Sequence, residues 1–428
     1  MNDYIFYAPY VPENWKIIPN KYVFRPHSKK VGKDFRNYNL LSLTKNGVIL
    51  KDIESNEGKL PASFEGYQTV ERNDLILCLF DLDVSAVFSG LSEYQGMITS
   101  AYDVYQVNTQ LMMPKFADYW FANVFSERSY SVYSKSLRHT IAYDSFKNIP
   151  IAIPSLETQS KIVSFLSEKI KTIDSLISNE TKQIEKLKKY RQAIITKTVT
   201  KGLGKNAPMK DSGVVWIGEI PENWSTIRIK NVSWLKGRIG WDGLKSSEFI
   251  DSGPYLITGT DFSNGSIDWK TCAHISEERY LQDELLHIKE NDLLITKDGT
   301  IGKLAIVKNC PEKVSLNSGV MIIRNDTAFK YSNRYLYYVL QSNQFFLWYE
   351  LSQSGNSTIK HLYQAQFYNF EFSYPSLNEQ SNIANYLDEK CSKIGLLLDS
   401  FEQKISKLKA YKQSLIYEYV TGKKRVSL

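Results

Sequence analysis

The sequence repeats itself, and this duplication constrains the fold more than any other feature. The segment VPENW at 11–15 recurs as IPENW at 220–224, and NDLI at 73–76 recurs as NDLL at 291–294. A later PSL triplet at 154–156 recurs at 375–377. The matches keep their order, and their offset grows from 209 to 221 residues, as insertions in loops would cause. The 428-residue chain is therefore expected to contain two copies of one structural plan.

The strongest match joins two segments with helical periodicity. Residues 154–200 and 375–421 are identical at 20 of 47 aligned positions. In both, apolar residues step by alternating four and three positions over about four heptads, which favours a two-helix coiled coil over helices that each cover their own globular half. The predicted seam consists of Leu166, Ile173, Ile177, Ile184, Leu187 and Ile194 in the first segment and Leu387, Ile394, Leu398, Phe401, Ile405, Leu408 and Leu415 in the second.

The ends of these segments carry ordinary helix punctuation. Pro154 and Pro375 precede them, and Gly202 and Gly422 follow them. At about 1.5 Å per residue, each helix would extend roughly 60–65 Å.

The regions outside the helices have the pattern of globular α/β domains. Short β-rich runs such as 74–80 and 293–296 alternate with turn residues. Residues 116–125 and 333–349 have the pattern of amphipathic helices rich in aromatic residues. The predicted organisation is a domain at 1–153, a long helix with linker at 154–205, a second domain at 206–374 and a second long helix at 375–428.

The net charge of +7 does not identify a nucleic-acid-binding protein by itself. The two helical segments together carry +9 and the two globular regions −2. A charged helix face is usually solvated. DNA binding by the globular regions would therefore need a local basic surface on a nearly neutral domain.

Composition excludes several other classes. No apolar run approaches the ~18 residues of a membrane helix, and the N-terminus has no secretory pattern. The four cysteines are far apart without a Cys-x-x-Cys pair, so neither a disulfide framework nor a metal site is expected. These features predict a cytoplasmic protein that does not associate with membranes.

Four catalytic motifs are absent from the sequence. No Gly-Lys pair is followed by Ser or Thr, so there is no P-loop, and no Gly-x-Gly-x-x-Gly dinucleotide motif follows a predicted strand. There is no Pro-Pro pair, which amino-methyltransferase tetrapeptides require, and no His-Glu-x-x-His. We therefore predict no catalytic residue and favour a binding protein. A self-contained DNA methylase or nuclease, and a coiled-coil adaptor without sequence specificity, remain as alternatives.

The whole layout resembles the DNA-specificity subunit of type I restriction–modification systems. The resemblance rests on two variable domains, each opened by Ile/Val-Pro-Glu-Asn-Trp and closed by Pro-Ser-Leu-x-x-Gln before a long heptad helix. The segments WIGEIPENW at 216–224 and NDLLITKDGTIG at 291–302 are similar to that family's, whereas the first domain has LCLFDLD at 77–83 and lacks the Gly-x-x-Gly turn. The resemblance implies an α/β fold with two target-recognition domains in tandem, separated by two long antiparallel coiled-coil helices in a pseudo-two-fold repeat.

The same resemblance implies a function and partners. The chain would be a non-catalytic subunit that recognises a bipartite, or split, sequence in double-stranded DNA. It would scaffold two modification (methyltransferase) subunits for adenine-N6 methylation and restriction (motor-nuclease) subunits for ATP-dependent cleavage. S-adenosylmethionine, ATP and Mg are expected on those subunits and no cofactor on this chain, which would act on the prokaryotic nucleoid.

Candidate DNA contacts are basic and polar residues in loops, because such side chains read base edges and hold phosphates. In the first domain they are Lys29, Lys30, Lys33, Arg36, Lys45, Arg138 and His139. In the second they are Lys236, Arg238, Lys245, Lys297, Thr300, Lys303, Lys360 and His361. For each residue, a solvated surface charge is the competing interpretation.

Overall fold

The computed structural model describes residues 11–45, 47–52, 63–85, 87–126, 129–134, 139–204, 206–238, 243–325, 330–353 and 361–426. The chain forms two compact units, Met1–Thr181 with Glu402–Leu428 (unit 1) and Lys182–Phe401 (unit 2). Both boundaries fall within long helices. Each unit therefore contains one globular body and parts of both helices; body 1 lies within 11–153 and body 2 within 206–374.

Body 1 is built around an antiparallel sheet with the strand order β2-β9-β6-β7. Smaller pairs are β1 with β10, β3 with β4 and β5 with β8. The strands are β1 (Lys16–Pro19), β2 (Phe24–Pro26), β3 (Leu41–Thr44), β4 (Gly47–Leu50), β5 (Gln68–Val70), β6 (Leu75–Leu77), β7 (Ser89–Leu91), β8 (Gly96–Ile98), β9 (Asp103–Val107) and β10 (Pro150–Ile153). The helices are α1 (Pro114–Ser126) and α2 (Tyr143–Phe146), with 3-10 turns at η1 (Asn20–Tyr22), η2 (Gly32–Asn37) and η3 (Ser129–Tyr133).

Body 2 has a sheet with the order β14-β22-β19-β20 and a second sheet with the order β18-β15-β21. Smaller pairs are β11 with β12, β13 with β23 and β16 with β17. The strands are β11 (Met209–Asp211), β12 (Glu219–Pro221), β13 (Ser225–Arg228), β14 (Trp234–Gly237), β15 (Ile250–Ile257), β16 (Phe262–Ser263), β17 (Ser266–Ile267), β18 (Ala273–His274), β19 (Leu293–Thr296), β20 (Leu304–Ile306), β21 (Val314–Leu316), β22 (Val320–Arg324) and β23 (Glu371–Tyr374). The helices are α4 (Glu277–Leu281), α5 (Asn333–Val339), α6 (Asn343–Ser352) and α7 (Gln364–Phe367), with 3-10 turns η4 (Ile229–Asn231), η6 (Ser246–Glu248) and η7 (Glu284–Leu286).

The two bodies share one topology. The four-stranded sheets correspond strand by strand in chain order, and the outer pair β1-β10 corresponds to β13-β23. The bodies differ in the segments between the shared strands, where body 2 has the additional β15 sheet and body 1 has the β3-β4 hairpin. The α/β class and the internal repeat predicted from the sequence are therefore confirmed.

A buried central strand divides each body into two apolar cores. Leu75 and Leu77 of β6 face one core and Ile76 faces another, because alternate side chains of a strand point to opposite faces. In β19, Leu293 and Leu294 divide in the same way. One core of each body also takes in residues of the long helices. The sheet is thus attached to the helices by continuous apolar packing.

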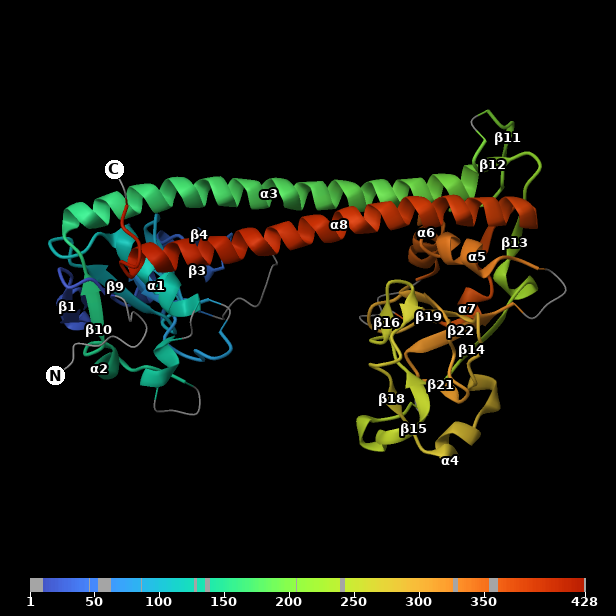
Figure 1. Ribbon diagram of the computed structural model, residues 1–428, viewed down its shortest axis with the longest axis horizontal. Coiled ribbons are helices and arrows are strands. Elements are labelled where there is room, and N and C mark those ends of the chain that lie inside the picture. The colour runs from blue at the N-terminus through green and yellow to red at the C-terminus, as the bar shows by residue number, and fades with distance from the viewer. Residues whose placement is uncertain are drawn as a thin grey trace. The chain divides into compact units, whose positions relative to one another are not determined.

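The long helices are α3 (Leu156–Lys201) and α8 (Leu377–Val420). Within each unit a part of α3 lies beside a part of α8 with the opposite chain direction (Figure 1). In unit 1, Lys412 Nζ lies 2.7 Å from Asp174 Oδ1, and Lys404 pairs with Glu180. Residue numbers therefore increase along α3 in the direction in which they decrease along α8, so the two helices are antiparallel within this unit.

Every residue of the predicted seam is buried or half-buried. Leu166 and Leu387 have no exposed surface, because a body covers them in addition to the partner helix. Leu187 and Leu408 are half-buried, since two helices alone shield only one face of each other.

A glutamine repeated at the start of both helices binds the preceding loop in the same way. Gln159 Nε2 donates to the carbonyl of Pro154 at 2.9 Å, and its Oε1 accepts from the amide of Met113 at 2.7 Å. Gln380 Nε2 donates to Pro375 at 2.9 Å, and its Oε1 accepts from the amide of Ser332. Both side chains are fully buried, which explains why the Pro-Ser-Leu-x-x-Gln pattern recurs.

The far end of each long helix packs on a repeated tryptophan. Gly422 follows α8 with φ +75°, and a Cβ at this position would lie 2.4 Å from Pro12 and 3.0 Å from Trp15. Gly202 follows α3 with φ +71°, and its Cβ would lie 3.1 Å from Trp224. Only glycine combines this backbone conformation with such close approach.

The segment 333–349, predicted as one helix, forms two helices in the structure. The prediction of a single helix over 333–349 is wrong, because α5 ends at Val339 and α6 begins at Asn343. Ser342 lies at the break in an extended conformation, and its hydroxyl accepts from the amide of Gln344. A hydroxyl cap of this kind starts a new helix at a point where the apolar period continues.

Replacement of a seam leucine by aspartate is expected to destabilise the helix pair. Each of Leu187→Asp and Leu408→Asp should lower the free energy of unfolding by about 1.5–3 kcal/mol, because the half-buried leucine loses its apolar contacts and a charged carboxylate is placed against the partner helix. The matched control is Leu396→Asp on α8, because Leu396 is 69% exposed. Thermal unfolding followed by far-UV circular dichroism measures both. Equal losses in the control and the seam variants would contradict this role of the seam.

Candidate nucleic-acid interface

The best-defined loop in body 2 is the turn between β19 and β20. Thr296 Oγ1 donates to the carbonyl of Thr300 at 2.5 Å and accepts from the amide of Lys303 at 3.0 Å. Gly299 and Gly302 have positive φ, which lets the chain reverse between these bonds. Thr300 and Lys303 are exposed at this turn. Two of the predicted DNA contacts therefore lie on a conformationally restrained tip.

A second segment is fastened to this turn. The amide of Leu362 donates to the carbonyl of Lys297 at 2.9 Å, and His361 Nδ1 pairs with the carboxylate of Asp298. The structure thus brings His361 to the turn that carries Thr300 and Lys303.

Two other predicted contacts are interior residues. Arg238 is 2% exposed; its Nε donates to the carbonyl of Leu316 at 3.1 Å and its Nη2 to Ser315 Oγ at 3.3 Å. Lys297 is 8% exposed, and its Nζ donates to the carbonyl of Arg238 at 3.1 Å. Burial lowers the pKa of the Lys297 ammonium. These cations support the base of the turn from inside the domain and do not present their charge at its surface.

The remaining predictions in body 2 differ in exposure. Lys236 is partly buried, with Nζ 3.1 Å from Asp283 Oδ2, whereas Lys245 is exposed just before η6. Lys360 lies outside the described residues. The exposed predicted group of body 2 is therefore Lys245, Thr300 and Lys303.

The predicted residues of body 1 form a compact exposed run. Lys29, Lys30, Lys33 and Arg36 are all exposed, and the last two lie in η2. Arg36 lies over the ring of Phe35, with its Cζ 5.8 Å from the ring centroid. We refer to these four residues as the basic run.

The other body 1 predictions are separate from the basic run. Lys45 is exposed after β3, and His139 is partly buried with φ +43°. Arg138 lies outside the described residues.

A repeated Asn-Asp turn precedes the central strand of each body. Asn73 has φ 70° and Asn291 has φ 68°. The following Asp74 accepts the amide of Glu71 at 2.8 Å, and Asp292 accepts the amide of Lys289 at 2.8 Å. Both carboxylates are 3% exposed, but Asp74 pairs with His27 and Asp292 with Arg324. The repeated segment is therefore a structural turn that positions the sheet.

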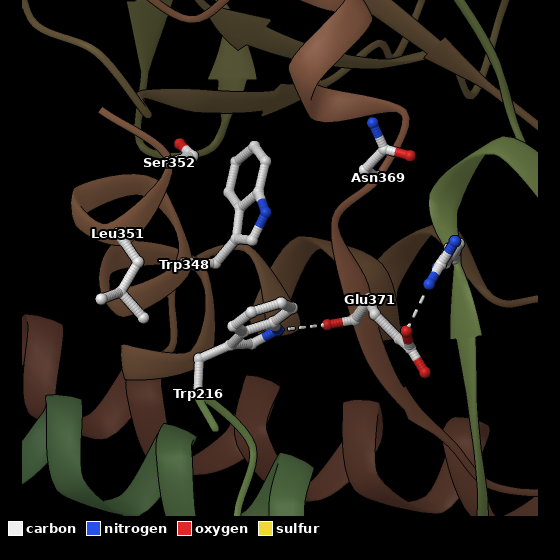
Figure 2. Close-up of a pocket in the computed structure, with 7 residues that line it drawn as sticks. Trp216, Trp348, Leu351, Ser352, Asn369 and Glu371 are labelled. Carbon is white, nitrogen blue, oxygen red and sulfur yellow. Dashed lines mark hydrogen bonds and ion pairs between the residues drawn. The ribbon is translucent and has the colours of Figure 1, made fainter. Parts of the chain in front are cut away.

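A pocket of about 340 Å³ in body 2 is lined by Trp216 and Trp348 (Figure 2). Trp216 Nε1 donates to the carbonyl of Glu371 at 2.7 Å, and the Glu371 carboxylate pairs with Arg228 at 3.3 Å. The hydroxyl of Ser352 donates to the carbonyl of Tyr349 at 2.8 Å. The bond of Trp216 fixes the opening segment of body 2 to β23. The Glu371 carboxylate and the Ser352 hydroxyl are both bonded to other protein groups, so neither is presented as a reactive group in this pocket.

Sequence reasoning did not identify Asn123, which lies on α1 among aromatic residues. Its side chain is 2% exposed, and neither polar atom has a hydrogen-bond partner within the described parts of the chain. The sequence could have indicated Asn123, because it is a single amide among Trp120, Phe121 and Phe125. An amide buried among aromatic residues needs hydrogen-bond partners, which makes such a position unusual.

In the ranges that the structure describes, no group of three or more His, Cys, Asp and Glu side chains is placed to hold a metal ion. No helix among these residues has the length and apolar character to cross a membrane.

Known proteins share the sequence pattern. The family model described as the type I restriction modification DNA specificity domain matches residues 104–186 and 221–407. The type I restriction enzyme MjaVIII specificity subunit of Methanocaldococcus jannaschii is 28% identical over 289 residues, which are 66% of this chain and 63% of that protein. The type I restriction enzyme EcoBI specificity subunit of Escherichia coli is 24% identical over 260 residues, which are 60% of this chain and 53% of that protein. The matched regions thus span less than two thirds of these relatives.

Solved structures share the fold. A chain from a structure described as showing complex assembly and conformational transition of the type I R-M system superposes with a TM-score of 0.68. It is 16% identical, and the superposition covers 96% of this chain and 98% of that one. Since the family model matches more than half of the residues, in both repeats, the chain belongs to the family of type I restriction modification DNA specificity domains.

Proposed function

We propose that this chain is the non-catalytic specificity subunit of a type I restriction–modification complex. Each body would read one half of a bipartite sequence in double-stranded DNA. The observation that supports this most directly is one sheet topology present twice, with different segments inserted between the shared strands. A common frame with different loops suits two readers of two different half-sites.

The exposed predicted residues are the proposed DNA contacts. They are the basic run and Lys45 in body 1, and Lys245, Thr300 and Lys303 in body 2. The partly buried His361, which pairs with Asp298 of the β19–β20 turn, is added to them. Arg238 and Lys297 are proposed to position the turn, since their burial keeps them from the DNA surface. Contacts to phosphates would orient each body, and loop side chains would read bases.

The two long helices are proposed to carry the partners. Two modification subunits would dock on them, bind S-adenosylmethionine and methylate adenine N6, and restriction subunits would add ATP-dependent cleavage. Exposed apolar residues recur at equivalent positions of the two helices, with Leu176 matching Leu397 and Tyr190 matching Tyr411. Such a repeat suits two copies of one partner. The complex would act in the prokaryotic cytoplasm, on the nucleoid.

Sequence-specific binding by the assembled complex tests this proposal. The complex with its modification subunits should bind a split target at least about 10³-fold more tightly than a scrambled duplex at physiological salt. The target is found by mapping methylated adenines in DNA from cells that carry the complex. Equal binding of all duplexes at about 150 mM salt would contradict the proposal, because non-specific phosphate binding is weakened there. Methyl transfer by the isolated chain would favour a self-contained methylase instead.

Exchange of body 1 for that of a relative is the matched control. It should change one half-site and leave the other unchanged. An unchanged first half-site would favour a coiled-coil adaptor.

A further inference from the structure

Body 1 and body 2 are attached to the long helices at equivalent places. The residues that precede α1 and α5 both donate their amides to a buried glutamine at the start of a long helix. Six residues further along, a tyrosine in each body bonds to the same long helix. Tyr119 Oη lies 2.9 Å from Ser167 Oγ, and the hydroxyl of Tyr338 donates to Asp388 Oδ1 at 2.6 Å. Position 122 of α1 therefore corresponds to position 341, which follows α5.

The backbone differs at these equivalent positions. α1 continues without a break from Pro114 to Ser126 and includes Ala122. The corresponding segment of body 2 is broken between α5 and α6, and Gln341 lies in the break. The last carbonyl groups and the first amides of a helix have no partner inside that helix. The break therefore supplies body 2 with free backbone groups at a place where those of body 1 are bonded within α1.

Residues of α3 bond to these groups of body 2. Gln192 Nε2 donates to the carbonyl of Gln341 at 2.7 Å and to Asn343 Oδ1 at 3.1 Å. The amide of Asn343, at the start of α6, donates to Thr196 Oγ1 at 3.0 Å. Arg191 Nη2 donates to Gln341 Oε1 at 2.7 Å. We refer to these five residues and their four hydrogen bonds as the polar clamp.

The equivalent place in unit 1 has a different arrangement. The α8 residues Lys412 and Gln413 correspond to the first two α3 residues of the polar clamp. Lys412 pairs with Asp174 at 2.7 Å, and no hydrogen bond of the Gln413 side chain is found among the described residues. Gln413 and Ala122 line a cavity of about 750 Å³ instead, together with Asn123 and other residues of body 1, α3 and α8. Body 1 therefore has open space where body 2 has hydrogen bonds.

This difference affects how firmly each body is oriented on its helices. Apolar packing attaches both bodies, but it is non-directional, whereas the strength of a hydrogen bond depends on its angle. Four hydrogen bonds in addition to the packing therefore hold body 2 at one orientation on its part of α3. The cavity beside body 1 leaves room for that body to tilt.

We propose that the polar clamp is a positioning element for the second half-site, and that body 1, which lacks it, accommodates changes in the spacing of the half-sites. The inference rests on the proposed function, in which each body reads one half of a split sequence. One base pair added between half-sites moves them about 3.4 Å apart and rotates them by about 34°, since B-DNA completes a turn in about 10.5 base pairs. A body that is held at one orientation cannot follow this change. Gln192 and Gln341 act through the orientation of body 2 and not by touching DNA.

Competition binding by the complex assembled with modification subunits tests this role. The probes are duplexes with both half-sites, identified by mapping methylated adenines, at the native spacer and with one base pair added or removed. In the double variant Gln192→Ala with Gln341→Ala, the ratio of the affinities for native and altered spacers should fall about tenfold. Three of the four clamp bonds are then lost, and each contributes at least about twofold.

The matched control is Gln413→Ala, the equivalent of Gln192 in unit 1, which should leave the ratio unchanged. A purely structural role of the clamp would lower the affinity for every spacer alike. An unchanged ratio in the double variant, or an equal fall in Gln413→Ala, would therefore overturn the inference. If circular dichroism shows that the double variant does not fold, Gln192→Ala alone is used, and an unchanged ratio there overturns the inference. Absence of sequence preference in the wild-type complex would instead contradict the proposed function, and the inference with it.

Discussion

Replacing Arg324 with methionine is expected to destabilise body 2 by about 3–5 kcal/mol, the cost of leaving one member of a buried ion pair without its partner. Arg324 Nε and Nη2 lie 2.7 and 2.6 Å from the two carboxylate oxygens of Asp292, and Nη2 also donates to the carbonyl of His287. The Asp292 carboxylate is only 3% exposed. Methionine would leave that charge buried and unpaired.

The duplication supplies an internal comparison. His27 lies 3.0 Å from the equivalent carboxylate of Asp74, but its side chain is 33% exposed and contacts through one ring nitrogen. Burial raises the pKa of the Asp74 carboxyl, against the effects of its hydrogen bonds to Glu71 and His27. His27→Ala is therefore expected to destabilise body 1 by only about 1–2 kcal/mol, since a partly solvated bond contributes less than a buried bidentate pair.

Urea unfolding with hydrogen exchange of peptides from each body measures these losses. Arg228→Met is the matched control, because Arg228 is 52% exposed in its pair with Glu371 and should cost less than about 1 kcal/mol. Asp292→Asn added to Arg324→Met should recover part of the loss. A loss in Arg324→Met no larger than in Arg228→Met would contradict the structural role of the pair.

Removal of the basic run is expected to weaken DNA binding strongly. Replacing Lys29, Lys30, Lys33 and Arg36 together by alanine should lower the affinity of the assembled complex by about 100-fold or more at about 150 mM salt, if each residue neutralises a phosphate. The slope of log affinity against log salt should become shallower by about 0.9 for each phosphate that the variant no longer neutralises. This expectation rests on the proposed function.

A charge-matched variant separates local effects from net charge. Lys210, Lys230, Lys270 and Lys308 are exposed residues of unit 2 outside the predicted set. Their joint replacement by alanine removes the same charge. Filter-binding or anisotropy titrations over a range of salt compare the two variants. Equal losses of affinity would mean that the net charge, and not the basic run, determines binding.

Much of the fold could be read from local pattern. The heptad spacing of residues such as Leu166 and Leu387 predicts the two long helices, because helical period and burial on one face are properties of a short window. The repeated segments predict the shared topology. Gln159 and Gln380 show why the repeat is retained: the same side-chain bonds are needed at the start of both helices.

The candidate site was less predictable. Arg238 and Thr300 both follow the pattern of polar loop residues, yet Arg238 is buried and Thr300 is exposed. The difference arises because Arg238 meets the carbonyl of Leu316 across 78 positions of sequence. No short window contains that interaction.

The sequence by itself therefore determined the duplication, the α/β class and the two long helices, since these depend on periodicity and on segments that match. Only the tertiary structure decided which cations reach the surface, where the 333–349 helix breaks, and that Asn123 lines a cavity. It also decided that Leu415 and Val420, at the end of α8, join the core of body 1. The physical reason is common to all of these: burial is set by packing between distant segments, and such packing exists only after the chain has folded.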